Sequence, residues 1–136
     1  MRFQRCHVRQ NLRPGWPGMS TILCIDDEPS ILTLHKLLFE TLGYHVVTAS
    51  AGADGIRALE SGHVDLVLLD YRMPDMTGAE VAEIIRRVEP DIPIVLESAY
   101  PNLPSTETRN VDAYLVKGEP TEILVHTVKG LLARAA

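Results

Sequence analysis

Residues 64–78 read VDLVLLDYRMPDMTG and hold the clearest strand-loop-helix pattern in the chain. The first seven of them, Val64–Asp70, form an apolar run that ends in an acid, which predicts a buried β-strand. Thr77 is followed three residues later by Glu80, the capping-box pattern that begins many helices. A strand leading into a helix is the unit from which parallel sheets are built.

The same alternation continues on both sides of this stretch, five times from Ser20 onward. Strands are predicted at Thr21–Asp26, Tyr44–Ala49, Val64–Asp70, Ile92–Leu96 and Val111–Val116. A helix is predicted from Pro29 to Gly43, with Ile31, Leu34, Leu38 and Leu42 as its apolar stripe. A weak helix is predicted over Ala53–Ser61, and a last helix opens at Pro120 with Leu124, Val128, Leu131 and Leu132 on one side.

Strands separated by helices predict an α/β fold with a parallel sheet covered on both faces. The expected arrangement is flavodoxin-like and doubly wound, with five strands in the order 2-1-3-4-5. We expect one domain over residues 20–134. Residues 1–19 are expected to form an irregular or disordered extension, and translation from Met19 would make residues 1–18 non-native.

Charge is unevenly distributed along the 136 residues, whose net charge is -5. Residues 1–18 hold four of the 13 basic residues and no acidic residue. The remainder of the chain therefore contains nine basic and 18 acidic residues. An acidic body does not favour nucleic-acid binding. No apolar run approaches the roughly 18 residues of a membrane span. With two cysteines and no export signal, we expect a cytoplasmic protein that neither binds nucleic acid directly nor inserts into a membrane.

Acidic residues stand at the ends of two predicted strands. Asp26 and Asp27 end the first strand and Asp70 ends the third, which the predicted strand order places side by side. Three converging carboxylates repel one another, so either one is protonated or a cation lies among them. All-oxygen ligands favour Mg²⁺, beside which a carboxylate can attack phosphorus. The alternative is that these acids merely end strands and cap a helix.

Three further residues follow or lie on strands at the same edge. Ser98 follows the fourth strand and offers a hydroxyl, and Lys117 follows the fifth and offers a cation for phosphoryl oxygens. Tyr114 lies on the fifth strand. Taken singly, each has an ordinary structural explanation as a turn serine, a surface lysine or a packed tyrosine.

Together these residues resemble the receiver domains of bacterial response regulators, the phosphoacceptors of two-component signalling. The matching segments are ILCIDDEPSIL, DLVLLDYRMPDMTG, PIVLESAY and DAYLVKG. The resemblance implies that Asp70 is the phosphoacceptor, that Asp27 binds Mg²⁺ directly and that Asp26 does so mainly through water. It implies that Arg72 supplies a backbone carbonyl to the metal, that Ser98 and Lys117 bind phosphoryl oxygens, and that Ser98 and Tyr114 switch on activation.

Three positions depart from the receiver pattern. Gly118 and Glu119 follow Lys117 where proline and an aromatic residue are usual, so Lys117 is expected to be aimed differently or to be more mobile. The segment 99–113 is short and contains Pro101 and Pro104, so the fourth helix should be short, displaced or absent. Glu97 replaces a usually apolar residue and either raises the phosphorylation barrier or points at solvent.

We therefore expect a stand-alone receiver of a phosphorelay, a monomer or weak dimer that signals by binding a downstream protein. Its phosphoryl donor would be a histidine kinase or a histidine phosphotransfer protein. It is not expected to be an enzyme beyond assisting its own phosphorylation and dephosphorylation. By family resemblance, Arg72 and Tyr100 would tune the rate of dephosphorylation. The alternative is a pseudo-receiver that acts as a phosphorylation-independent interaction module. A phosphohydrolase is disfavoured because Arg72 replaces an acid, and a flavin site because the loop at residues 26–29 is acidic.

Overall fold

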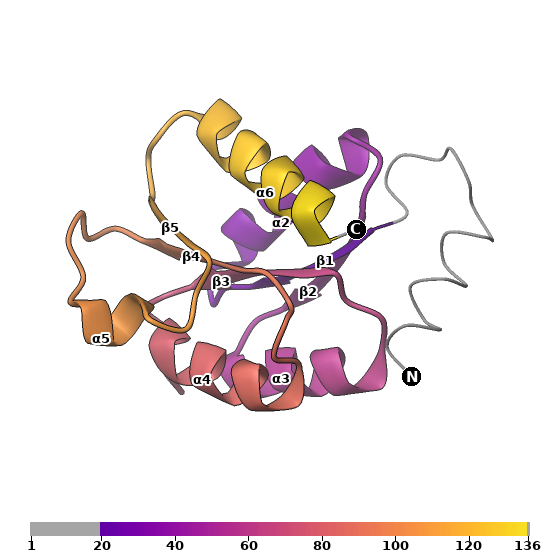
Figure 1. Cartoon of the computed structure of the whole chain (residues 1–136). Helices are drawn as coiled ribbons and strands as arrows, with labels where there is room; N and C mark the ends of the chain where they lie inside the picture. Colours follow the sequence, from indigo (N-terminus) through magenta and orange to yellow (C-terminus); the bar gives the residue numbers. More distant parts are fainter. Residues whose placement is uncertain (1–19, 136) are drawn as a thin grey trace.

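A single five-stranded parallel sheet organises the computed structural model, which describes residues 20–135. Its strand order is β2-β1-β3-β4-β5, the flavodoxin-like order expected from the sequence (Figure 1). The strands are β1 (Thr21–Ile25), β2 (His45–Ala49), β3 (Leu66–Asp70), β4 (Ile94–Ser98) and β5 (Ala113–Val116). The extension predicted for residues 1–19 lies outside the described residues.

Helices cover both faces of the sheet. Figure 1 shows α2 and α6 on one face and α3 and α4 on the other, with the short α5 near the β5 edge. The helices are α2 (Pro29–Thr41), α3 (Gly52–Ser61), α4 (Gly78–Val88), α5 (Ser105–Thr108) and α6 (Thr121–Ala135). None of the helices within residues 20–135 is long and apolar enough to cross a bilayer.

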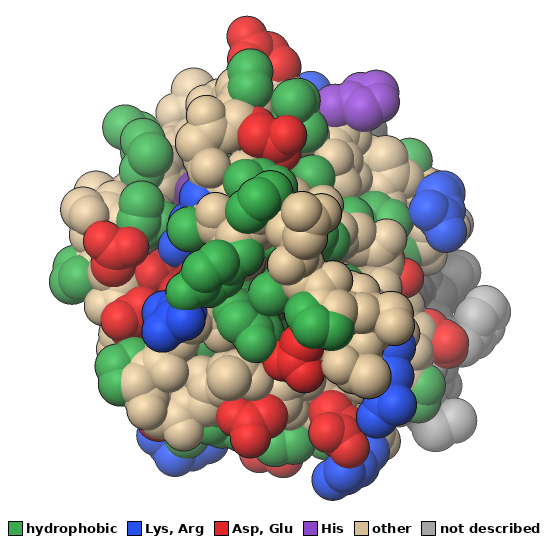
Figure 2. Space-filling model, turned by 90° about the vertical axis from the view of Figure 1, so that its left-hand side faces the viewer, with side chains coloured by type: hydrophobic (Ala, Val, Ile, Leu, Met, Phe, Trp, Pro, Cys, Tyr) green, Lys and Arg blue, Asp and Glu red, His purple; other side chains and the backbone are tan. Residues whose placement is uncertain are grey.

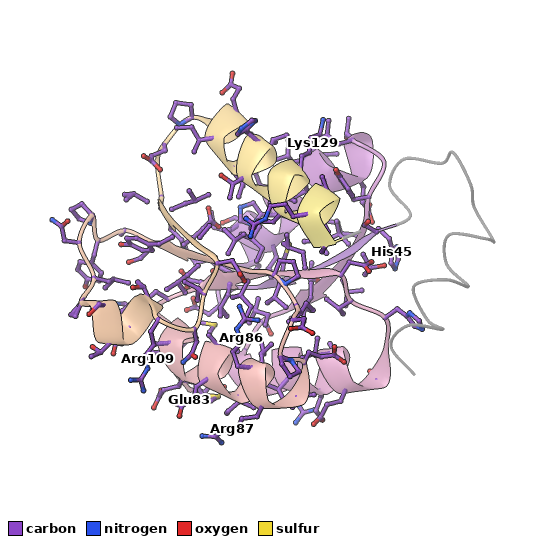
Figure 3. The ribbon with its side chains drawn as sticks, viewed as in Figure 1. His45, Glu83, Arg86, Arg87, Arg109 and Lys129 are labelled. Atoms are coloured by element: carbon purple, nitrogen blue, oxygen red, sulfur yellow. The ribbon has the colours of Figure 1, made fainter. Side chains whose placement is uncertain are left out.

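The core forms two clusters because neighbouring residues of a strand point to opposite faces. Val67 and Leu69 of β3 pack on the α3/α4 side, while Leu66 and Leu68 pack on the α2/α6 side. The predicted stripe of α6 is confirmed, since its four residues are all buried. α4 buries one side and carries the exposed ion pair Glu83–Arg87, 3.0 Å long, on its outer side (Figure 3).

The stripe predicted for α2 is wrong in its register. The buried residues are Leu32, His35 and Phe39, whereas Leu34 is 57% exposed. α2 has apolar residues on several sides, so its periodicity allowed more than one buried face. Packing of Phe39, which is 0% exposed, against the sheet selects the observed one.

The strand boundaries also shift slightly from the predicted ones. β3, β4 and β5 each begin two residues after the predicted start, and β4 runs on to Ser98. Val64, Ile92 and Val111 still pack against the core without joining the sheet. The sequence pattern therefore extends the predicted strands over apolar residues that are in fact partly or fully buried loop residues.

The segment between β4 and β5 contains only one helical turn. α5 has four residues and follows Pro104, which occupies its N-cap position. This confirms the prediction of a short or absent helix, because proline both lacks an amide hydrogen and clashes within a helix. The turn lies beside the edge strand β5, as Figure 1 shows.

Candidate functional site

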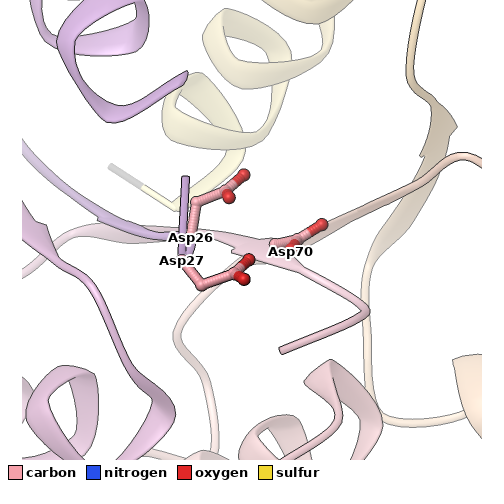
Figure 4. Close-up of side chains that lie close together, drawn as sticks. All are labelled: Asp26, Asp27 and Asp70. Carbon is pink, nitrogen blue, oxygen red and sulfur yellow. The ribbon is translucent and has the colours of Figure 1, made fainter. Parts of the chain in front are cut away.

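The site lies at the carboxyl ends of β1 and β3. Ile25 pairs with Leu69 across the sheet, so the next residues, Asp26 and Asp70, lie side by side at the carboxyl end of the sheet. One carboxylate oxygen from each of Asp26, Asp27 and Asp70 lies within 4.8 Å of the others (Figure 4). Asp26 is 2% and Asp70 6% exposed, while Asp27 is the most exposed of the three.

Lys117 provides a positive charge at this cluster. Its Nζ lies 2.7 Å from Oδ1 of Asp70 and 3.3 Å from Oδ2 of Asp26. Burial alone would lower the pKa of Lys117, but its hydrogen bond to Asp70 and the charge of Asp26 raise the pKa above its usual value. The sequence prediction that Lys117 is aimed differently is therefore not what the structure shows, and its greater mobility stays a prediction.

The carboxylates remain only partly neutralised by this lysine. Burial raises the pKa of Asp70 to about 6; the hydrogen bond from Lys117 opposes the rise, and the charge of Asp26 adds to it. Three closely spaced carboxylates and one ammonium leave a net negative site formed by oxygen donors. Hard divalent cations that keep part of their water shell, such as Mg²⁺, suit this donor set. No second group of three possible metal ligands occurs in residues 20–135.

A surface pocket opens above these carboxylates. Asp27, Asp70, Ser98 and Lys117 line it together with Met73, Pro74 and Tyr100, whereas Asp26 is not among its lining residues. Figure 2 views the molecule from the side to which the carboxyl ends of the strands point, and shows apolar side chains gathered near the middle of this face with charged ones around them. The pocket is thus accessible from solvent, although its acidic floor is largely buried.

Ser98 and Lys117 are brought together by the β4–β5 pairing. Ser98 pairs with Val116, and the amide of Lys117 donates to the carbonyl oxygen of Ser98 at 2.8 Å. The Ser98 hydroxyl oxygen accepts a hydrogen bond from the amide of Tyr100 at 3.0 Å. Because that oxygen acts as an acceptor here, its own hydrogen remains able to donate to a ligand in the pocket.

Arg72 and Tyr114 both contact Tyr100 at the rim of the pocket. The guanidinium of Arg72 donates to the Tyr100 hydroxyl, and its Cζ lies 5.2 Å from the centre of the Tyr100 ring. The hydroxyl of Tyr114 donates to the backbone carbonyl of Tyr100. Arg72 lines the pocket, and its role as a metal ligand through the backbone carbonyl stays a prediction. The Tyr114 hydroxyl is held at the surface by its hydrogen bond to Tyr100.

Gly118 takes a backbone conformation that suits glycine. Its φ is +94°, in the left-handed region, where a side chain would be strained. Glu119 accepts a hydrogen bond from the amide of Val116 at 3.2 Å and closes the turn after β5. The turn following Lys117 is therefore defined by Gly118 and Glu119, the two residues that depart from the receiver pattern.

Glu97 and His35 form a buried pair that the sequence reasoning missed. Oε1 of Glu97 on β4 lies 3.6 Å from Nε2 of His35 on α2, and the two residues are 9% and 8% exposed. Burial raises the pKa of Glu97 to about 7 and lowers the pKa of His35. Of the two alternatives for Glu97, exposure to solvent is wrong, and an effect on the phosphorylation barrier stays a prediction. His35 lies between Leu32 and Phe39 at helical spacing, which was the signal that could have placed it on the buried face.

Comparison with known proteins agrees with this geometry. A family model described as the response regulator receiver domain matches residues 22–129. The transcriptional regulatory protein GlrR of Escherichia coli is 33% identical over 118 residues, which cover 85% of this chain and 27% of that protein. The chain therefore spans about a quarter of the length of this curated relative.

Solved structures show the same fold. The response regulator TrrA of Thermotoga maritima in complex with Mg²⁺-BeF is 38% identical, with a TM-score of 0.78 over 82% of this chain and 98% of that one. The CheY-like receiver domain protein of Methanospirillum hungatei is 29% identical, with a TM-score of 0.81 over 85% and 95%. TrrA has also been solved with the histidine kinase ThkA; that TrrA chain is 38% identical, with a TM-score of 0.77 over 83% and 98%. With its strand order, its acidic site and the family match over most of its length, the chain belongs to the response regulator receiver domain family.

Proposed function

We propose that Asp70 accepts a phosphoryl group from the phosphohistidine of a histidine kinase or a histidine phosphotransfer protein. The observation that carries this proposal is the position of Asp70, which lines an open pocket with its carboxylate 2.7 Å from Lys117 and within 4.8 Å of two other aspartates. Phosphoryl transfer depends chiefly on placing the attacking oxygen and neutralising charge on the phosphoryl oxygens, and this pocket offers both.

The residues present fit a Mg²⁺ ion. Asp26, Asp27 and Asp70 would hold it with the backbone carbonyl of Arg72, Asp27 directly and Asp26 mainly through water. When bound, the ion neutralises the phosphoryl oxygens and the surrounding carboxylates. That TrrA, which is 38% identical, is described in complex with Mg²⁺-BeF supports the same chemistry here.

Within the chain, each residue has a separate task. Asp70 must be ionised to attack phosphorus, and Lys117 promotes this because its ammonium favours the charged carboxylate. Lys117 also exchanges its contact with Asp70 for one with a phosphoryl oxygen, to which the Ser98 hydroxyl donates a hydrogen bond. The leaving imidazole of the donor keeps the electron pair of the broken P–N bond, and the new bond joins phosphorus to Asp70.

The phosphorylated form would then bind a downstream protein through a changed surface around residues 99–114. Ser98 would move toward the phosphoryl group and Tyr114 would turn inward. In this structure the Tyr114 hydroxyl is bonded to the Tyr100 carbonyl, so that turn must break this hydrogen bond. Shifting a two-state equilibrium from 1:99 to 99:1 requires about 5.5 kcal/mol of differential stabilisation. The isolated chain would remain a monomer or weak dimer.

Intact-mass spectrometry tests the proposal. The full chain and Asp70→Asn are incubated with acetyl phosphate or phosphoramidate, with and without Mg²⁺. The proposal predicts a gain of one phosphoryl mass in the wild type that depends on Mg²⁺ and is absent from Asp70→Asn. If no adduct forms and beryllofluoride does not bind in the presence of Mg²⁺, the pseudo-receiver alternative replaces the proposal.

A further inference from the structure

Helix α3 begins without a cap of its own. Its N-cap residue is Ala51, whose side chain cannot accept a hydrogen bond, although the first amides of every helix lack partners within the helix. Two of these amides are bound by a carboxylate from elsewhere in the chain. Oδ1 of Asp75 accepts from the amide of Gly52 and Oδ2 from the amide of Ala53, both at 3.2 Å.

Asp75 belongs to the loop between β3 and α4, 23 residues away from Gly52. Both of its oxygens are used, one for each amide, so the carboxylate binds the helix end in a fixed orientation. The amide of Ala53, followed by that of Gly52, holds the pKa of Asp75 below its usual range despite opposing desolvation. The contact joins two segments that lie far apart in the sequence.

The start of α3 is also packed closely against this loop. A Cβ placed on Gly52 would lie 2.8 Å from Cγ2 of Val81 and 3.1 Å from Sδ of Met76. Only a residue without a side chain brings the helix amides so near to Asp75 and the beginning of α4. Gly52, which weakens α3 as an isolated helix, is therefore required by the contact between the two segments.

The loop held in this way contributes to the phosphoacceptor pocket. It joins Asp70 to Gly78, and Arg72, Met73 and Pro74 within it line the pocket. Its ends are fixed by backbone hydrogen bonds, from Tyr71 to the Glu97 carbonyl at 2.8 Å and from Gly78 to the Tyr71 carbonyl at 2.6 Å. Asp75 lies between these two anchored ends and ties the middle of the loop to α3.

We propose that Asp75 is a positioning residue for the metal site: by capping α3 it holds the loop in the arrangement in which the Arg72 carbonyl can bind Mg²⁺. The inference rests on the proposed function, because it assumes that Mg²⁺ binds at Asp26, Asp27 and Asp70. Asp75 itself lies outside that cluster and need not touch the ion. Without the cap, the loop samples other arrangements. The apparent affinity for Mg²⁺ then falls in proportion to the fraction of molecules whose loop is in the arrangement that can bind the ion.

The test measures Mg²⁺ binding to the full chain by isothermal titration calorimetry. Asp75→Ala is compared with Asp54→Ala, which removes an equal charge from the first turn of α3 but leaves the contact with the loop intact. We expect Asp75→Ala to raise the dissociation constant for Mg²⁺ about five-fold. This is the change expected if the loop of the variant takes up its metal-binding arrangement about one fifth of the time. Asp75→Asn, which keeps one acceptor oxygen, should recover part of the loss, and Asp54→Ala should change the constant less than two-fold.

Hydrogen exchange without metal provides a second measurement. Amides of residues 52–53, 71–73 and 75–77 should exchange faster in Asp75→Ala than in Asp54→Ala. Equal Mg²⁺ affinities in these two variants would overturn the inference while leaving the proposed function in place. Failure of the wild type to bind Mg²⁺ would instead overturn the proposed function. Faster exchange with unchanged affinity would show that Asp75 is structural only, which also overturns the inference.

Discussion

Glu97 of β4 faces His35 of α2 close to the acidic site, with Oε1 3.6 Å from Nε2 and both side chains buried. Lys117, Asp26 and Asp70 are the other charged groups that affect Glu97. A carboxyl group in this position is costly to ionise, because burial removes water and two aspartates repel its charge. The pair therefore makes the stability of the domain depend on pH.

Replacing Glu97 by Gln should make stability less sensitive to pH. The pKa of Glu97 is raised from 4.5 to about 7 by burial, so the folded protein holds this proton more tightly than the unfolded chain does. The resulting stabilisation is fully present below about pH 4.5 and is lost as pH rises through about 7. Glu97→Gln should therefore gain stability over the wild type between pH 5 and 8, by up to about 3 kcal/mol.

Urea unfolding of both proteins at several pH values measures this difference. Glu60→Gln, an exposed position on α3, serves as the control. A Glu97→Gln difference that stays constant from pH 5 to 8 would show that Glu97 is not kept protonated by its surroundings.

Removing the charge of Lys117 should have opposite effects on metal binding and on phosphorylation. Lys117→Met leaves the carboxylates of Asp26 and Asp70 without their ammonium partner, so Mg²⁺ should bind about five-fold more tightly, or about 1 kcal/mol. Phosphorylation by acetyl phosphate should nevertheless slow at least about ten-fold, because one group that neutralises the phosphoryl oxygens is lost.

Calorimetry measures the change in Mg²⁺ binding, and intact-mass time courses measure the change in phosphorylation rate. Lys129→Met, at an exposed position, serves as the control (Figure 3). Weaker Mg²⁺ binding by Lys117→Met would contradict the electrostatic argument.

Two glycines should respond to alanine in opposite directions. Gly118 has a φ of +94°, so Gly118→Ala should lose about 1 kcal/mol of stability through backbone strain. Gly130 lies within α6, where an added Cβ meets nothing within 4 Å, so Gly130→Ala should gain up to about 1 kcal/mol. Urea unfolding of both variants checks the prediction, which fails if the two changes have the same sign.

The short helix α5 should be coupled energetically to the end of β3. The hydroxyl of Tyr71, the residue after Asp70, donates to Oε1 of Glu107 on α5 at 2.8 Å. A double-mutant cycle with Tyr71→Phe and Glu107→Ala should give a coupling free energy of about 1 kcal/mol, as for a hydrogen bond to a charged acceptor at a partly buried site. Strictly additive effects would mean that this hydrogen bond does not tie α5 to β3 in solution.

Much of the site could be predicted from local sequence patterns. Val64–Asp70 and Thr21–Asp26 each combine an apolar run with acids at its end, and parallel sheets gather the carboxyl ends of their strands at one edge. The prolines at 101 and 104 determined that α5 is short, because proline is incompatible with a helix interior whatever surrounds it. These inferences needed only the periodicity and covalent geometry of the chain.

Other features depended on which segments the fold brings together. The sequence of α2 allowed several buried faces, and only packing of Phe39 against the sheet selected the one that carries His35. From the sequence, Glu97 stood only as a replacement for a usually apolar residue, and α2 supplies its partner His35. Nothing in the sequence singled out Asp75, which lies beside the start of α3 only in the folded chain. By itself the sequence determined the strands, the helices and the acids at the strand ends, because these follow from local patterns. The tertiary structure alone determined the pairs His35–Glu97 and Asp75–Gly52, because a contact between distant residues depends on the crossovers that place one element against another.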